Sequence, residues 1–180
     1  MFAVDELMVS VAGAGMDGRA EQSGDFASAF EGAFARLQVL LELVCVSGDP
    51  WPRRVHVAIR RALSFAADDP AAASVLTNAA LTQGGDGFER YERLMAYLAG
   101  LLEPGRAESP HGADLPPTTE RSLAGGVAAI VANRVDRGRA EELPELADEV
   151  VQFILTPYIG TEEARRIATA ADWPGSQPDR

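Results

Sequence analysis

Apolar residues recur along the chain at the three- and four-residue spacing that is typical of amphipathic helices. No segment alternates polar and apolar residues over a length that indicates a strand. The pattern therefore predicts an all-α fold. Its clearest run is a long helix between residues 25 and 46, whose apolar face carries Phe26, Phe30, Phe34, Leu37, Leu41 and Val44.

Signals for helix starts divide the following segment. Asp49-Pro50 and Asp69-Pro70 each combine an N-cap residue with a proline suited to a first turn. Asp86 with Glu89 resembles a capping box. We expect three helices here, the second ending near residue 81 and the third near residue 102.

A loop rich in proline and glycine covers residues 103–117 and precedes the C-terminal helices. One helix is expected over 119–137 and another, with a very wide apolar face, over 143–156. Pro157 should kink or end the latter, and Gly160 precedes a last helix. The chain is thus expected to form a bundle of about six to seven helices.

The helix over 119–137 lacks a polar face through the stretch SLAGGVAAIVANR. A helix that is apolar on all sides is buried on all sides. Either a partner subunit or the rest of the same chain could cover its second side, and the sequence leaves both open.

Charge and composition limit the classes of function that the chain can have. The formal net charge is -11, from 27 acidic and 16 basic residues. All the basic residues are arginine, and this balance argues against a broad nucleic-acid or anionic-membrane surface. A single cysteine, Cys45, fits a reducing compartment. The N-terminus has acids where a signal peptide is basic, and the most apolar run is too short to span a bilayer. We expect a cytoplasmic protein with no membrane contact.

Groups for catalysis or metal binding are scarce. His56 and His111 lie far apart in the sequence, and neither has a metal-ligand spacing with Cys45. The glycines of 84–87 follow no strand and include no lysine, which argues against a phosphate loop. We therefore expect no enzyme, no cofactor and no metal.

Four segments together resemble the ligand-binding and dimerisation domain of the tetracycline-repressor (TetR) family of bacterial transcription regulators. They are FASAFEGAFARL, DPWPRRVHVAIRRALSFAADDPAAASVL, SLAGGVAAIVANRV and ELPELADEVVQFILTPYIGTEEARRIA. The resemblance implies a ligand-binding and dimerisation domain over 25–173, followed by a flexible tail over 174–180.

In that family the two long helices near the C-terminus pack against their twofold mates as a four-helix bundle. The resemblance thus implies a homodimer in which the partner covers the helix over 119–137, while an intramolecular bundle is the alternative. The implied interface residues are Leu123, Gly125, Gly126, Val127, Ala129, Ile130, Ala132, Val150, Phe153 and Ile154.

The family also places a small-molecule pocket among the first helices of this domain. Apolar walls with few polar groups suit such a pocket, although ordinary core packing needs the same residues. A mostly apolar ligand is expected. The candidate lining residues are Phe30, Phe34, Leu37, Leu41, His56, Ile59, Leu63, Leu76, Tyr91, Met95, Tyr97 and Leu98.

Residues 1–24 stand where family members carry a helix-turn-helix. AVDELMVSVAGAG is similar to its first helix and turn, but MDGRAEQSGD lacks the residues of a recognition helix. The segment is expected to be a degenerate remnant or a leader, and DNA binding is doubtful. The expected function is sensing and dimerisation; alternatives are heterodimerisation with a full-length regulator and a structural dimer without ligand.

Overall fold

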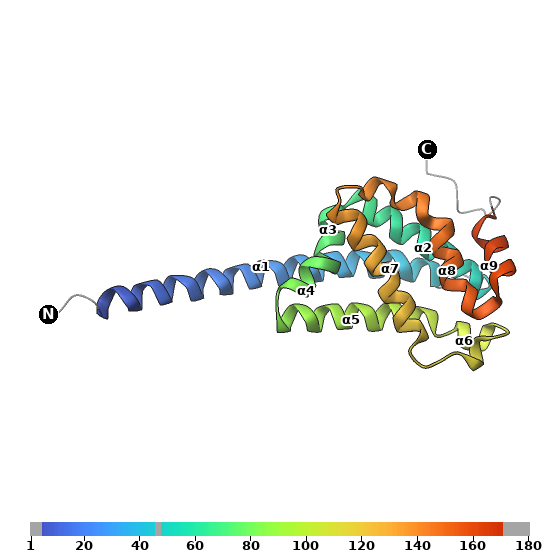
Figure 1. Ribbon diagram of the computed structural model, residues 1–180, viewed down its shortest axis with the longest axis horizontal. Helices are drawn as coiled ribbons and strands as arrows, with labels where there is room; N and C mark the ends of the chain where they lie inside the picture. The colour runs from blue at the N-terminus through green and yellow to red at the C-terminus, as the bar shows by residue number, and fades with distance from the viewer. Residues whose placement is uncertain (1–4, 46–47, 171–180) are drawn as a thin grey trace.

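The computed structural model describes residues 5–45 and 48–170, and every regular element in these ranges is helical. This confirms the all-α prediction and the bundle (Figure 1). The longer helices are α1 (Asp5–Cys45), α2 (Trp51–Asp68), α5 (Gly85–Leu102), α7 (Thr119–Asp136), α8 (Ala147–Ile159) and α9 (Thr161–Ala168). The shorter elements are α3 (Pro70–Ser74), the π-helical turn η1 (Val75–Ala79), α4 (Ala80–Thr82), α6 (Gly105–Glu108) and the 3-10 turns η2 (Gly112–Asp114) and η3 (Ala140–Leu146).

Helix α1 is continuous across the boundary expected between residues 24 and 25. Its N-terminal half projects away from the bundle, and its C-terminal half packs into it (Figure 1). The turn expected around residue 13 lies within this helix. The expected tail over 174–180 lies outside the described residues.

The apolar interior is divided into two clusters. The first is formed mainly by α2, η3, α8 and α9, and its most buried large side chains are Trp51, Leu63, Leu143, Leu155 and Tyr158. The second is formed by α1, α3 to α5 and the inner face of α7, and it includes Phe30, Phe34, Leu37, Leu41, Leu76, Leu94 and Met95. The apolar spacing predicted for the segment 25–46 is therefore confirmed as a buried face.

One local prediction, the capping box, is wrong. Helix α5 begins at Gly85 after Gly84, whose φ of 79° is accessible to glycine, and no side chain caps it, so Asp86 and Glu89 form no capping box. Pro157 lies inside the last turn of α8, which continues to Ile159. The helix thus ends two residues after the proline that was expected to kink or end it.

The segment expected as a loop over 103–117 contains α6 and η2 and is fixed by Arg106. The guanidinium donates to the carbonyls of Leu115 at 2.9 Å and Pro116 at 2.7 Å and to the Glu120 carboxylate at 2.8 Å. Tyr158 donates its hydroxyl proton to Glu120 at 2.9 Å. The segment is thereby attached to α7 and α8.

Candidate functional site

A cavity of about 340 Å³ separates the two apolar clusters. Its walls come from α1, α2, the α3–η1 segment, α5, α7 and one residue of α8. Small-molecule pockets usually hold about 300–1,000 Å³, so the cavity has the size of a small ligand site. Residues of both clusters face it, among them Val55 and Val131 from the first and Leu37 and Met95 from the second.

The cavity owes its volume to alanines on facing helices. Ala58, Ala62 and Ala66 recur every four residues along α2, and Ala124 and Ala128 do so on α7. A four-residue spacing places side chains on one face of a helix. At these five positions the side chain is a single methyl group, which leaves unfilled the space that a larger side chain would occupy.

Half of the ligand-site residues predicted from the sequence line this cavity. They are Leu37, Leu41, Ile59, Leu76, Met95 and Leu98. The others lie elsewhere: Phe30, Phe34 and Leu63 are buried within the clusters without facing the cavity. Tyr97 packs edge-on against Phe34 with ring centroids 5.5 Å apart.

Tyr91 borders a different hollow, a surface groove of about 300 Å³. Burial, followed by the neighbouring Glu92 carboxylate, raises the pKa of its hydroxyl. Tyr91, which the sequence predicts as a ligand-site residue, does not line the larger cavity, because this stretch of α5 faces α4 and α7. Thr77, Asn78, Leu81, Ala128, Ala129, Ala132, Asn133 and Asp136 complete the groove.

His56 is buried at the α2–α8 contact and does not line the cavity. Its Nε2 accepts a hydrogen bond from Arg60 Nε at 2.5 Å, and Arg60 in turn pairs with Asp148 of α8. Burial, followed by the charge of Arg60, lowers the pKa of the imidazole. A neutral histidine in this position acts as an acceptor that orients Arg60. The contact with a ligand that the sequence predicts for His56 stays a prediction.

Polar side chains gather at one end of the cavity, where α2 begins. Trp51 and Arg54 both line it there. Trp51 is 1% exposed and packs on Tyr158 with ring centroids 4.7 Å apart. Its other side meets Gly105, where an added Cβ would lie 2.5 Å from the indole ring, so this position admits only glycine.

The π-helical turn η1 borders the cavity through Leu76 and Thr77. Thr77 is buried, and its hydroxyl donates to the carbonyl of Ala73 at 2.8 Å, which leaves its oxygen facing an otherwise apolar wall. Single π-helical turns within α-helices are frequent at functional sites.

Sequence reasoning missed Trp51, Arg54 and the alanines. Trp51 and Arg54 follow Asp49-Pro50 at the start of a helix, and in the sequence they indicate no more than that start. The alanine spacing on α2 and α7 was the available signal, because six alanines of the chain lie on the cavity wall: Ala58, Ala62, Ala66, Ala73, Ala124 and Ala128.

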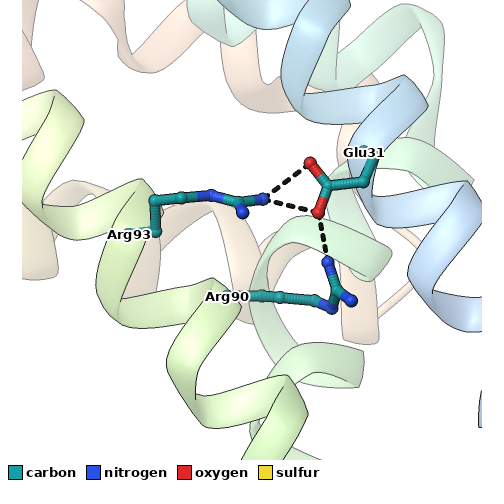
Figure 2. Close-up of polar contacts among 3 residues, drawn as sticks. All are labelled: Glu31, Arg90 and Arg93. Atoms are coloured by element: carbon teal, nitrogen blue, oxygen red, sulfur yellow. Dashed lines mark hydrogen bonds and ion pairs between the residues drawn. The ribbon is translucent and has the colours of Figure 1, made fainter.

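An ion-pair cluster fixes α1 to α5 near the cavity (Figure 2). Glu31 of α1 accepts hydrogen bonds from Arg93 at 2.6 Å on both carboxylate oxygens and also pairs with Arg90. Arg93 additionally lies over the rings of Phe30 and Phe34. Its hydrogen bonds lower the pKa of Glu31. Two turns further along α1, Leu37 and Leu41 reach the cavity wall.

The predicted interface residues fall into two groups. Leu123, Val150 and Ile154 are buried within the single chain, which leaves them almost no area to offer a partner. The wide apolar face of α8 is covered by α2, η3 and α9. Val127 and Ile154 line the cavity, and Ile130 packs partly buried against the first cluster.

The second group lies on the outer face of α7 and the adjacent part of α8. Ala129 is exposed, Gly125 and Ala132 are partly exposed, and Phe153 is 44% exposed. The Phe153 ring lies against Gly126, where an added Cβ would be 3.0 Å from the ring. The close approach predicted at Gly126 therefore occurs within the chain.

Comparisons with protein-family models, curated proteins and solved structures gave no match to this chain. Within residues 5–45 and 48–170 no group of three or more potential metal ligands comes together. None of the helices in that part of the chain has the combined length and apolar character needed to cross a bilayer.

Proposed function

We propose that the chain is a sensor module similar to the ligand-binding and dimerisation domain of TetR-family regulators, which binds a small, mostly apolar molecule. One observation carries the proposal: an apolar cavity of about 340 Å³ lies between the two clusters and is walled by α1, α2, α5 and α7. Native interiors are close-packed, with few voids larger than a water molecule. An apolar space of this size between packed helices, open to solvent at its rim, favours an occupant.

Helix α1 supplies a route by which occupancy could influence the rest of the molecule. It contributes Leu37 and Leu41 to the cavity wall and continues to Asp5 beyond the bundle. The Glu31 cluster with Arg90 and Arg93 holds it against α5 between these two regions (Figure 2). A ligand that prefers one position of α1 shifts the population toward it.

The outer face of α7 supports the dimerisation half of the proposal. Gly125, Ala129 and Ala132 present small side chains there, and Phe153 of α8 adds a partly exposed ring beside them. Small residues permit the close approach of a symmetry-related helix, and twofold dimers are the commonest oligomers. A related full-length regulator would bind as a partner at the same face.

The proposal assigns no DNA contact to the chain. With a net charge of -11 and no lysine, the chain as a whole repels phosphate. Its regulatory effect would then pass through a partner bound at the α7–α8 face.

Binding of 1-decanol tests the sensor proposal. At ten times its dissociation constant, a ligand that binds only the folded state adds about 1.4 kcal/mol to stability. For a chain of this size that raises Tm by about 3–6 °C. Differential scanning fluorimetry across alcohols from hexanol to dodecanol measures the shift and its length dependence. If neither these alcohols nor the fatty acids of the same lengths raise Tm, the cavity is not a ligand site.

Ala129→Arg tests the dimer. An arginine at this exposed position places two like charges across a twofold interface and weakens the dimer at least about tenfold. Sedimentation equilibrium of wild type and variant gives the dissociation constants. Ala96→Arg, at an exposed position of α5, is the matched control and leaves the dimer intact. The proposed interface is contradicted if the wild type is monomeric, or if both variants lose the same amount of dimer affinity.

A further inference from the structure

We infer that the natural ligand of the cavity is an apolar monocarboxylate, held with its carboxylate at the start of α2 against Trp51 and Arg54. This inference rests on the proposed function, since it names the class of molecule for the same cavity. The polar groups at one end of the cavity indicate the acidic head of such a ligand, and the apolar walls indicate its body.

The indole N–H of Trp51 is the first of these groups. Trp51 is 1% exposed, and within the described part of the chain its Nε1 has no hydrogen-bond partner. A buried tryptophan normally finds an acceptor for this proton. Because Trp51 also lines the cavity, an acceptor atom on a bound molecule can complete the missing bond.

Arg54 is the second group. It lies three residues after Trp51, so both side chains leave α2 on neighbouring positions of one face. Its hydrogen bond of 2.8 Å to Glu108 uses one N–H of a guanidinium that carries five. The Glu108 side chain is 44% exposed, so this pair lies at the solvent edge and can be exchanged for an internal carboxylate.

The helix itself adds to the positive field. The first turn of α2 carries Arg53 and Arg54 and no acidic residue, although acids are favoured there by the positive end of the helix dipole. Asp49, just before the helix, pairs with Arg53 at 3.1 Å and not with Arg54. A ligand anion at this end would receive both the dipole and a charge-assisted hydrogen bond. The arrangement discriminates an acid from a neutral molecule of the same shape.

Beyond Arg54 the lining becomes apolar. Along α2 the wall continues through Ala58 and Ala62 to Phe65, which the helical rise places about 16 Å from Arg54. Burying a carboxylate without a partner is very costly, whereas burying an alkyl body is favourable. The wall therefore fits an apolar body with one acidic end at the N-terminus of α2.

Decanoate and 1-decanol provide a matched pair of probes that differ in the head group. Isothermal titration calorimetry on the full chain measures both affinities. Decanoate is expected to bind at least about tenfold more tightly than 1-decanol, since hydrogen bonds to charged groups exceed neutral ones. In nitrogen-15 NMR spectra the Trp51 indole resonance, assigned with a Trp173→Phe variant, shifts with decanoate.

Two substitutions at the solvent edge localise the head group. Arg54→Gln removes the charge and is expected to cancel the tenfold preference for decanoate over 1-decanol. Glu108→Gln breaks the same surface ion pair but retains the Arg54 charge, and it is expected to keep or strengthen decanoate binding. Arg54 is partly exposed and Glu108 is exposed, so each variant should fold.

The outcomes separate the two proposals. If 1-decanol binds as tightly as decanoate, or the indole resonance does not move, the carboxylate assignment is overturned while the sensor proposal stands. If Arg54→Gln and Glu108→Gln reduce the affinity for decanoate equally, the ion pair has a structural role only. The carboxylate assignment is then likewise overturned. If neither probe binds, both proposals fail.

Discussion

Glu120→Ala is expected to reduce the free energy of unfolding by about 3 kcal/mol, because it removes one member of a buried charged network. Glu120 is 5% exposed and joins Arg106 of α6 to Tyr158 of α8. Without the carboxylate, the hydroxyl of Tyr158, a fully buried residue, loses its acceptor. Arg106 would also lose the anchor that holds α6 against α7. Urea unfolding followed by circular dichroism measures the change.

Tyr158→Phe is the matched control for this prediction. It removes only the hydroxyl and keeps the ring that packs on Trp51, so the expected loss is about 1 kcal/mol. If Glu120→Ala costs no more than Tyr158→Phe, the Arg106–Glu120 pair contributes nothing beyond one hydrogen bond, and the attribution is wrong.

The same network makes stability depend on pH. Burial raises the pKa of Glu120, but the hydrogen bonds from Arg106 and Tyr158 outweigh it and lower the pKa overall. A lowered pKa in the folded state means that the unfolded chain binds the proton first. The stabilisation by Glu120 is therefore present above its ordinary pKa and is lost as the pH falls through its folded value.

Helix positions and core faces could be predicted from the sequence because their determinants are local. The spacing of Phe30, Phe34, Leu37 and Leu41 fixes which side of α1 is buried, whatever helix covers it. A capping box is also a local signal, but Asp86 and Glu89 do not form one. Helix α5 already begins at Gly85, after Gly84 in a backbone conformation that other residues avoid.

The cavity and interface depend on which helices face each other, and periodicity does not encode that. Large apolar residues at a helical spacing are equally suited to fill a cluster, as Phe34 does, or to line a cavity, as Leu37 does. Likewise the breadth of the apolar face of α8 does not reveal that its own chain covers Val150 and Ile154. What an apolar face contacts is decided by the tertiary arrangement.

The alanine spacing carries more information about the site than the large residues do. Methyl groups at Ala58, Ala62 and Ala66 on α2 face Ala124 and Ala128 on α7 across the cavity. Filling this space with larger residues would stabilise an ordinary core, because each added methylene contributes about 0.8 kcal/mol when buried. That these positions are small is therefore consistent with a requirement for space.

Ala58→Leu is expected to abolish the binding of 1-decanol while preserving the fold. The leucine side chain would occupy the cavity beside Ala62 and displace the alkyl body of a ligand. Cavity-filling substitutions commonly add about 0.5–2 kcal/mol to stability, so Tm of the unliganded variant should equal or exceed that of wild type. Calorimetry should show an affinity reduced at least about 100-fold, equivalent to about 2.7 kcal/mol.

Ala35→Leu provides the control, because Ala35 is exposed on α1 and the added methyl groups enter solvent. This variant should retain wild-type affinity and Tm. If Ala58→Leu binds 1-decanol as wild type does, the alcohol occupies another site, such as the groove beside Tyr91, and any stabilisation it produces does not report on the cavity. If Ala58→Leu loses both binding and stability, the leucine overpacks the wall, and Ala62→Val, a smaller addition to the same wall, then has to weaken binding without unfolding the chain.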